Sequence, residues 1–305
     1  MTRPDVAPDE LAAWCAAHLD ARPSEVLFTT GHLSYVAGLR LTDGRRVVVK
    51  ARPATAGLAQ CHAIQQSLAD RGFPCPAPLC GPQPLGAYTA TAEVLVSGGS
   101  LLSPGAPGAV DAYAGLLAAL VRAIPDVSGV KPFDPPPWVH WGHSFDGIWP
   151  PPDDVDEDLN ARPDPGWADD LGRRVRARLR SLDLPLRVGH GDWEAQNLRF
   201  DGVTPSVVHD WDSAVLLPEA AIAGHAAAVW TAGSDAGEPD LAASAAFLAS
   251  YQRAAGRVFT TDEIEVAWAA GLWTRLFNVK KWSPHGYTGL TPEAAHARAE
   301  RAALL

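Results

Sequence analysis

Three polar side chains at fixed spacings constrain this chain more than any other feature of its sequence. Asp192 and Asn197 lie in the segment VGHGDWEAQN, and Asp210 follows in the segment VVHDWD. A carboxylate can accept the proton of a hydroxyl group. Amide and carboxylate oxygens suit Mg²⁺ when phosphate oxygens complete its coordination shell. The two segments therefore predict a hydroxyl-activating carboxylate, Asp192, beside a magnesium site at Asn197 and Asp210.

Apolar residues flank both segments. They predict short buried strands at 184–188 and 206–208, paired as a hairpin, which would turn the two carboxylates toward the same cleft. An isolated aspartate followed five residues later by an asparagine usually forms a turn. Two such segments, each next to an apolar run, favour the functional interpretation instead.

The motif HGD-x4-N followed by HDWD resembles the catalytic and metal-binding pair of aminoglycoside phosphotransferases. Those enzymes share the protein-kinase fold with choline, homoserine and fructosamine kinases. The resemblance implies that Asp192 is the catalytic base and that Asn197 and Asp210 bind Mg²⁺, with Asp210 in the role of the aspartate of the kinase Asp-Phe-Gly element. It also implies that His190 holds the backbone of the loop.

The first fifty residues show the order strand, glycine turn, strand, Asp-Gly turn, strand, lysine. The glycine turn covers residues 31–34, and the third strand ends in Lys50. This order resembles the nucleotide-binding sheet of a kinase N-lobe. The resemblance implies that Lys50 binds the α- and β-phosphates of ATP and that Ser34, with the backbone of its turn, covers the phosphates.

The helix expected at 56–71 departs from the family pattern. In the family this helix usually carries a glutamate that bonds the lysine, and no glutamate is present here. Gln60 or His62 would then orient Lys50 by a neutral hydrogen bond, or Lys50 pairs elsewhere. Loss of the charge-assisted bond would weaken this link.

Residues 93–96 end an apolar strand and match the hinge, whose backbone would bind the adenine edge. Glu93 and Leu95 are therefore expected among the nucleotide-binding residues. Hinge recognition uses main-chain groups, so the Glu93 side chain could equally be a surface group at a strand end.

A segment rich in proline, tryptophan and aspartate spans 132–158. Its proline triplets exclude regular elements, and long loops of this kind are often functional. Trp138 or Trp141 could stack on a substrate ring, and the acidic run at 153–158 could meet substrate amines. The alternative is a solvated acidic turn with tryptophans that fill a gap.

The remaining chain is mainly helical. A largely apolar helix is expected at 108–124 and an arginine-rich helix at 166–182, whose arginines would form a solvated face. Further helices are expected at 220–231, 240–256, 262–280 and 292–304. Candidate substrate ligands in this part of the chain are Asp235 and Glu238, in the loop after Trp230, and Asn278 and Trp282.

Bulk properties narrow the choice of partners. The 305 residues suffice for two lobes, a nucleotide-binding lobe at 1–97 and a catalytic lobe at 98–305. A net charge of −10 argues against nucleic-acid binding and fits a cationic substrate. Four cysteines without metal spacing and the lack of an apolar membrane span favour a cytoplasmic protein. A monomer or weak homodimer is expected.

The fold expected from the resemblance is α+β and two-lobed, with a small mixed sheet in the N-lobe and a mostly helical C-lobe. The expected reaction is ATP- and Mg²⁺-dependent phosphorylation of a small-molecule hydroxyl, with an aminoglycoside or related amino sugar as the first candidate. A metabolite kinase acting on choline, a sugar or an amino alcohol is the nearest alternative. Because the helix glutamate is missing, a second alternative is that the protein is a catalytically weak nucleotide-binding module. A third alternative, suggested by the paired aspartates, is a phosphate-handling hydrolase.

Overall fold

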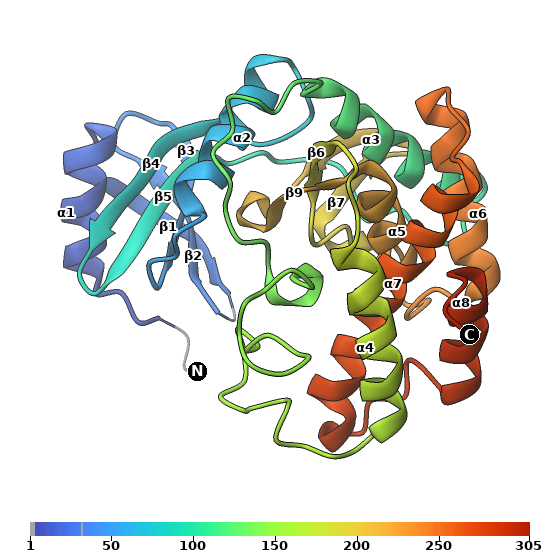
Figure 1. The fold of residues 1–305 in the computed structure, drawn as a ribbon. Helices are drawn as coiled ribbons and strands as arrows, with labels where there is room; N and C mark the ends of the chain where they lie inside the picture. The colour runs from blue at the N-terminus through green and yellow to red at the C-terminus, as the bar shows by residue number, and fades with distance from the viewer. Residues whose placement is uncertain (1–3, 32) are drawn as a thin grey trace. The chain divides into compact units, whose positions relative to one another are not determined.

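The computed structural model describes residues 4–31 and 33–305, which form two compact units, one extending to Gly98 and one beginning at Gly99 (Figure 1). Position 32, in the predicted glycine turn, lies outside the described residues. Among the residues described, no helix is long and apolar enough to cross a membrane.

The first unit is a five-stranded antiparallel sheet in the order β1-β2-β3-β5-β4. The valines of β3 alternate between its two faces. Val47 and Val49 are buried in a core that includes Trp14 and Cys15 of α1, whereas Lys50 points to the other face. The predicted order of strands and turns is confirmed, but the sheet is antiparallel throughout and not mixed as predicted, and the third strand continues past Lys50 to Arg52. The elements are α1 (Pro8–Leu19), β1 (Pro23–Thr30), β2 (Tyr35–Leu41), β3 (Arg46–Arg52), α2 (Leu58–Asp70), β4 (Pro78–Leu85) and β5 (Tyr88–Val94).

The second unit is mainly helical and contains two small sheets, β6–β9 and β7–β8. The predicted helices are confirmed to within a few residues. Thr260 forms the expected capping box with Glu263 at the start of α7. The elements are α3 (Ala109–Ala123), α4 (Gly166–Arg180), β6 (Leu186–His190), β7 (Leu198–Asp201), β8 (Thr204–Val208), β9 (Ala214–Pro218), α5 (Glu219–Val229), α6 (Leu241–Ala255), α7 (Thr261–Trp282) and α8 (Pro292–Arg301).

The predicted hairpin between the two catalytic strands is wrong. β6 pairs with β9, and β8 pairs with β7, a strand that was not predicted from the sequence. The two-residue turn of the β7–β8 hairpin is Gly202-Val203, with Gly202 at φ +60°. The Asp201-Gly202 sequence at the start of this turn is a strong hairpin signal. Asp210 is therefore placed by the short hairpin that starts directly after Asn197.

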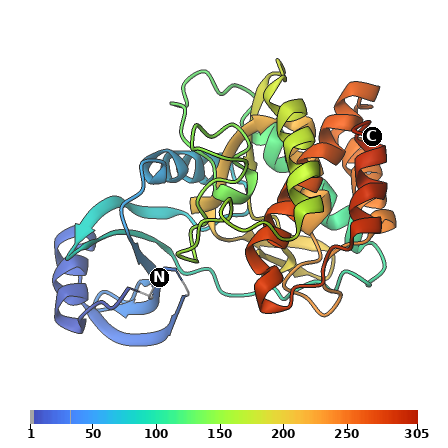
Figure 2. The same cartoon turned by 60° about the horizontal axis from the view of Figure 1, so that its bottom comes forward.

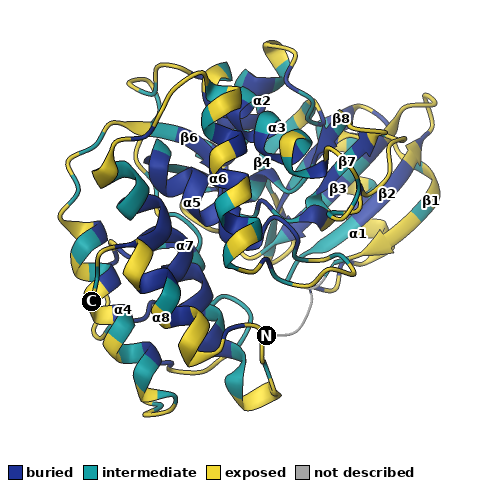
Figure 3. Ribbon diagram, turned by 90° about the vertical axis from the view of Figure 1, so that its right-hand side faces the viewer, coloured by how far each residue is buried: buried dark blue, intermediate teal, exposed yellow. Residues whose placement is uncertain are grey.

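Helices α5 and α7 form the centre of the second unit, and nearly all of α5 is buried (Figure 3). Gly224 and Gly271 allow their close approach, because a Cβ on Gly224 would lie 1.9 Å from the carbonyl oxygen of Ala267. The segment between α3 and α4 runs as a long loop with one short 3-10 turn, Pro137–Val139, as the proline triplets predict (Figures 1 and 2).

Candidate active site

His190 fixes the geometry of the catalytic loop. Its Nδ1 accepts a hydrogen bond of 3.1 Å from the backbone N–H of Asp192, so Nε2 carries the ring hydrogen and donates to the carbonyl of His209 at 2.9 Å. One buried ring thus links the loop after β6 to the segment after β8. The backbone role predicted for His190 is confirmed.

Asp192 and Asn197 are in direct contact. The Nδ2 group of Asn197 donates to Oδ2 of Asp192 at 2.6 Å and to its carbonyl oxygen at 3.0 Å. Both amide hydrogens are thereby committed to Asp192. Oδ1 of Asn197 is the amide atom left for a cation, as a metal ligand requires.

Asp210 has an unusual backbone conformation. It is in the left-handed region, with φ 66° and ψ 48°, which a residue with a Cβ adopts rarely, although Asp and Asn tolerate it best. Its carbonyl accepts from Ser213 N–H at 3.1 Å, and Ser213 in turn accepts from Gly191 N–H at 2.6 Å. Sparsely populated conformations of this kind cluster at active sites.

The site carries an excess of negative charge. Burial raises the pKa of Asp192 well above its usual range, and the nearby negative charges of Glu194 and Asp210 raise it further. Burial also raises the pKa of Glu194 to about 7, although Gln196 donates a hydrogen bond of 2.6 Å to it. A divalent cation near Asp210 would offset this repulsion.

The donor set fits Mg²⁺, since Asn197 and Asp210 provide hard oxygen ligands. Within the described part of the chain, no group of three His, Cys, Asp or Glu side chains could hold a metal ion. A cation held by these two residues therefore needs additional ligands, and phosphate oxygens are the usual ones.

The raised pKa of Asp192 has a measurable consequence. If Asp192 is the general base, as the resemblance implies, it must be ionised to act, and kcat/KM is then expected to rise with pH through its raised pKa. Glu194→Gln removes a neighbouring negative charge, lowers the pKa of Asp192 and should move the acidic limb of the profile to lower pH. Asp201→Asn, an exposed change at the end of β7, is the control. A limb that stays in place or moves to higher pH in Glu194→Gln would contradict this assignment.

In the first unit, Lys50 pairs with a strand residue. Its Nζ lies 3.2 Å from Oε1 of Glu93 on β5. Glu93 is 7% exposed, so the alternative of a surface group at a strand end is wrong. The structure thus shows a charged partner for Lys50 outside α2, as the alternative that Lys50 pairs elsewhere predicts.

The nucleotide-binding roles expected for Lys50, Glu93, Ser34 and Leu95 all stay predictions. Ser34 follows a tight turn at Gly31, where φ is +116° and a Cβ would lie 1.9 Å from the Ser34 carbonyl oxygen. The backbone N–H of Leu95 donates to the carbonyl of Arg46 at 3.0 Å. Because the N–H of Leu95 is used in this bond, adenine bound at Leu95 would contact the carbonyl oxygen of Leu95.

The tryptophans of the 132–158 segment mainly fill space. Trp149 and Trp141 are buried, and Trp149 donates to Asp169 at 2.7 Å. Trp138 instead donates its ring N–H to the carbonyl of Gly191, next to Asp192. The gap-filling interpretation therefore holds for Trp141 and Trp149, while Trp138 connects the segment to the catalytic loop.

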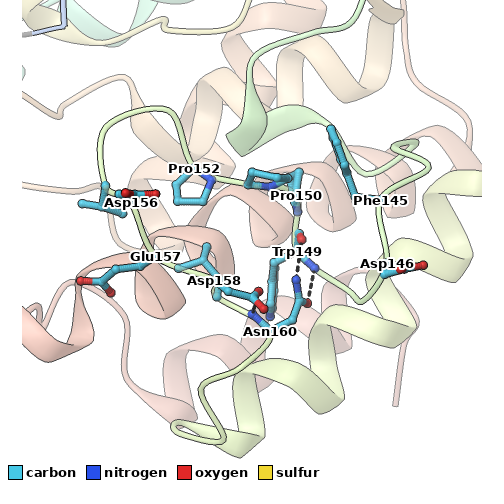
Figure 4. Close-up of a pocket in the computed structure, with 12 residues that line it drawn as sticks. Phe145, Asp146, Trp149, Pro150, Pro152, Asp156, Glu157, Asp158 and Asn160 are labelled. Carbon is cyan, nitrogen blue, oxygen red and sulfur yellow. Dashed lines mark hydrogen bonds between the residues drawn. The ribbon is translucent and has the colours of Figure 1, made fainter. Parts of the chain in front are cut away.

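The acidic run of this segment is partly neutralised. Asp154 pairs with the buried ammonium group of Lys281 at 2.6 Å, and Asp153 lies 3.8 Å from it. Farther along, Asn160 bonds the backbone of Trp149 and shapes a pocket lined by prolines and by Asp156 to Asp158 (Figure 4). The interpretation as a fully solvated acidic turn is wrong for Asp153 and Asp154.

The arginines of α4 do not form a uniformly solvated face, contrary to the prediction. The guanidinium group of Arg176 donates to the carbonyls of Trp141, His143 and Gly147 at 3.0, 2.7 and 2.6 Å. This clamp holds the tryptophan-rich loop. Arg178 pairs with Asp262 of α7, whereas Arg173, Arg174 and Arg180 are exposed.

Arg176→Lys should destabilise the protein by about 2 kcal/mol, because one ammonium group cannot replace three charged hydrogen bonds to separate carbonyls. We expect a lower midpoint in thermal unfolding followed by circular dichroism. Arg173→Lys is the matched control, since Arg173 is exposed and pairs with Asp170 on its own helix. Equal midpoints for the two variants would show that the clamp contributes nothing.

Among the candidate substrate ligands, Glu238 has a structural role. It pairs with the buried Arg275 at 2.6 Å and accepts a hydrogen bond from Tyr287. Asp235 is exposed, and Asn278 and Trp282 are half-buried. Sequence reasoning missed Arg176, Arg275 and Lys281, whose partners are distant in the sequence and carry no local signal.

A small antiparallel sheet with a paired lysine, and a helical unit with an Asp–Asn pair and an aspartate in the left-handed conformation, are features that fit the kinase-like phosphotransferase implied by the resemblance. Residues 29–266 match the model of the Phosphotransferase enzyme family. The chain belongs to that family and is a small-molecule kinase. No curated protein sequence matches it.

Solved structures agree on the fold. Amicoumacin kinase, in complex with AMP-PNP, Ca²⁺ and its ligand Ami, superposes with a TM-score of 0.63 at 10% identity, over 92% of this chain and 88% of that one. Spectinomycin phosphotransferase, in complex with ADP and spectinomycin, gives 0.58 at 12% identity over 98% and 94%. A choline/ethanolamine kinase family protein from Mesorhizobium loti gives 0.58 at 16% identity over 97% and 92%. The predicted two-lobed α+β kinase-like fold is confirmed.

Proposed function

We propose that this protein transfers the γ-phosphoryl group of ATP to a hydroxyl group of a small molecule in an Mg²⁺-dependent reaction. The observation that carries the proposal is the contact of Asp192 with Asn197 in a loop that His190 ties to the segment of Asp210. In a member of the phosphotransferase family, this arrangement would hold a general base, Asp192, and two cation ligands, Asn197 and Asp210, in fixed positions relative to one another.

Asp192 is assigned as the base. It orients the acceptor hydroxyl and takes its proton while the acceptor oxygen bonds to the γ-phosphorus and the bond from that phosphorus to ADP breaks. The raised pKa of Asp192 suits proton acceptance near neutral pH.

Asn197 and Asp210 are assigned as the ligands that hold Mg²⁺, which neutralises charge on the phosphates when bound. In the first unit, Lys50 and Ser34 are assigned to the phosphates, and the Leu95 carbonyl to adenine. The contact between Asn197 and Asp192 would also keep the base oriented.

The substrate class is proposed from charge. The negative charges of Glu194 and Asp210 act on Asp192, and the chain carries a net charge of −10. A hydroxyl acceptor that also carries amines fits this surrounding, as in an aminoglycoside or related antibiotic. Two structural neighbours bind antibiotics, spectinomycin and amicoumacin. We further propose that the protein confers antibiotic resistance. We expect it to be cytoplasmic and to be a monomer or a weak homodimer.

A kinase of choline or of another amino alcohol is the second candidate, because a choline/ethanolamine kinase family protein has the same fold. The negative charges near Asp192 fit its cationic head group as well. The two candidate functions are therefore distinguished by measuring turnover separately with aminoglycosides and with choline.

The test is acceptor-dependent ADP formation from Mg-ATP with aminoglycosides, amino sugars, macrolides, choline and uncharged sugars. We expect turnover with an amine-bearing hydroxyl acceptor and little with uncharged sugars. Turnover with uncharged sugars alone would contradict the substrate class. ADP formation that needs no acceptor would favour a hydrolase, and nucleotide binding without turnover would favour a binding module.

A further inference from the structure

The partner of Lys50 lies on a strand. In the pairing of β3 with β5, Lys50 is opposite Thr91 and Val48 is opposite Glu93. Lys50 and Glu93 are thus diagonal neighbours on one face of the sheet, close enough for long side chains to meet. Their side chains are only 15% and 9% exposed, and the Nζ–Oε1 distance is 3.2 Å.

The second oxygen of Glu93 is held by helix α2. Nε2 of Gln65 donates to Oε2 of Glu93 at 2.9 Å and to the carbonyl of Pro76 at 2.9 Å. One buried amide therefore links α2, the loop that follows it and β5. The only carboxylate of α2 itself is Asp70, at the end of the helix, where it accepts from Gln66 at 2.8 Å.

We propose that Glu93, held by Gln65, is the residue that positions Lys50 for phosphate binding. A buried ion pair is effective only if its remaining polar atoms are also bonded. Gln65 bonds Oε2 of Glu93, while Lys50 lies 3.2 Å from Oε1. A glutamate on β5 and a glutamine on α2 together replace the helix glutamate that the sequence lacks. Gln65 is the neutral link through which α2 sets the orientation of the pair.

This inference rests on the proposed function, because Lys50 must bind ATP phosphates. Glu93→Gln keeps the shape of the side chain and removes its charge. We expect it to raise the Kd for Mg-AMP-PNP and the KM for Mg-ATP about tenfold, the usual magnitude for loss of a charged hydrogen bond. The KM for the acceptor should stay unchanged. The matched control is Glu25→Gln, which removes an exposed pair with Arg40 on the same sheet.

A double-mutant cycle tests whether Glu93 acts through Lys50. The Kd for Mg-AMP-PNP is measured by calorimetry for the wild type, Glu93→Gln, Lys50→Met and the double variant. We expect Glu93→Gln to have less than about a twofold effect in the Lys50→Met background, because coupled residues are not additive. An equal effect in both backgrounds, or none in either, would overturn the proposal.

Gln65→Met provides a second test that leaves the ion pair in place. It should raise the Kd about threefold, less than Glu93→Gln because it removes an uncharged donor, and this effect should also vanish in the Lys50→Met background. If Glu93→Gln does not fold, Gln65→Met decides alone, and an unchanged Kd would overturn the role of Gln65. A wild type that binds no nucleotide would refute the proposed function. A wild type whose affinity is insensitive to Glu93 would refute this inference only.

Discussion

Asp192→Asn is expected to lower kcat for phosphotransfer by roughly 10²–10⁴-fold, the usual contribution of a general base. The variant keeps an oxygen for the hydrogen bond from Asn197, now 2.6 Å long, so the loop should keep its conformation. Mg-AMP-PNP affinity should stay within a factor of about two, because the base contacts the acceptor and not the nucleotide. Asp201→Asn, an exposed change in the same unit, is the control.

The same variant should also stabilise the protein. A carboxyl group whose pKa is raised in the folded state contributes stability below its unfolded pKa, and that stability is lost as pH rises through the folded pKa. Burial and neighbouring charges raise the pKa of Asp192. The neutral amide escapes this loss, so the melting midpoint of Asp192→Asn should exceed that of the wild type at pH 8, with a smaller difference at pH 5. If Asp192→Asn kept full activity and an unchanged melting midpoint, Asp192 would not belong to the active site.

Asp210→Asn is expected to cause the second large loss. Asparagine tolerates the left-handed conformation of residue 210 as well as aspartate does. The loop should therefore persist while the proposed Mg²⁺ site loses a charged ligand. We expect the Mg²⁺ concentration needed for half-maximal activity to rise roughly 100-fold and kcat to fall by a similar factor.

Asp212→Asn is the comparison for Asp210→Asn. Asp212 lies two residues after Asp210, in the 3-10 turn Trp211–Ser213, and its place in the HDWD motif predicts a carboxylate that braces the loop and not a primary metal ligand. Its Mg²⁺ requirement should match that of the wild type. A larger shift in Asp212→Asn than in Asp210→Asn would reverse the assignment of the metal ligand.

The part of the site that the sequence predicts is the part made by neighbours in the sequence. Asp192, Asn197 and His190 lie within eight residues, and their spacing alone brings them into hydrogen-bond contact once the loop turns. Helix ends were predictable for the same reason, since the capping box of Thr260 and Glu263 is a local interaction.

The remaining features depend on pairing between distant segments. The contact of Lys50 with Glu93 follows from the register of β3 with β5, which no local pattern specifies. The pairing of β6 with β9 and the bonds of Arg176 to three carbonyls have the same origin. Only the β7–β8 hairpin had a local signal, Asp201-Gly202, that would have corrected the predicted strand pairing.

The most direct test of the account follows a labelled γ-phosphate. Mg-ATP carrying radiolabelled γ-phosphate is incubated with the wild type or with Asp192→Asn and with the acceptor selected from the panel, and the products are separated by chromatography. We expect the label on the acceptor with the wild type. With Asp192→Asn, the label should remain on ATP although the nucleotide still binds. Label transferred equally by both proteins, or released as inorganic phosphate by the wild type, would contradict the assignment of Asp192 as the base of a small-molecule kinase.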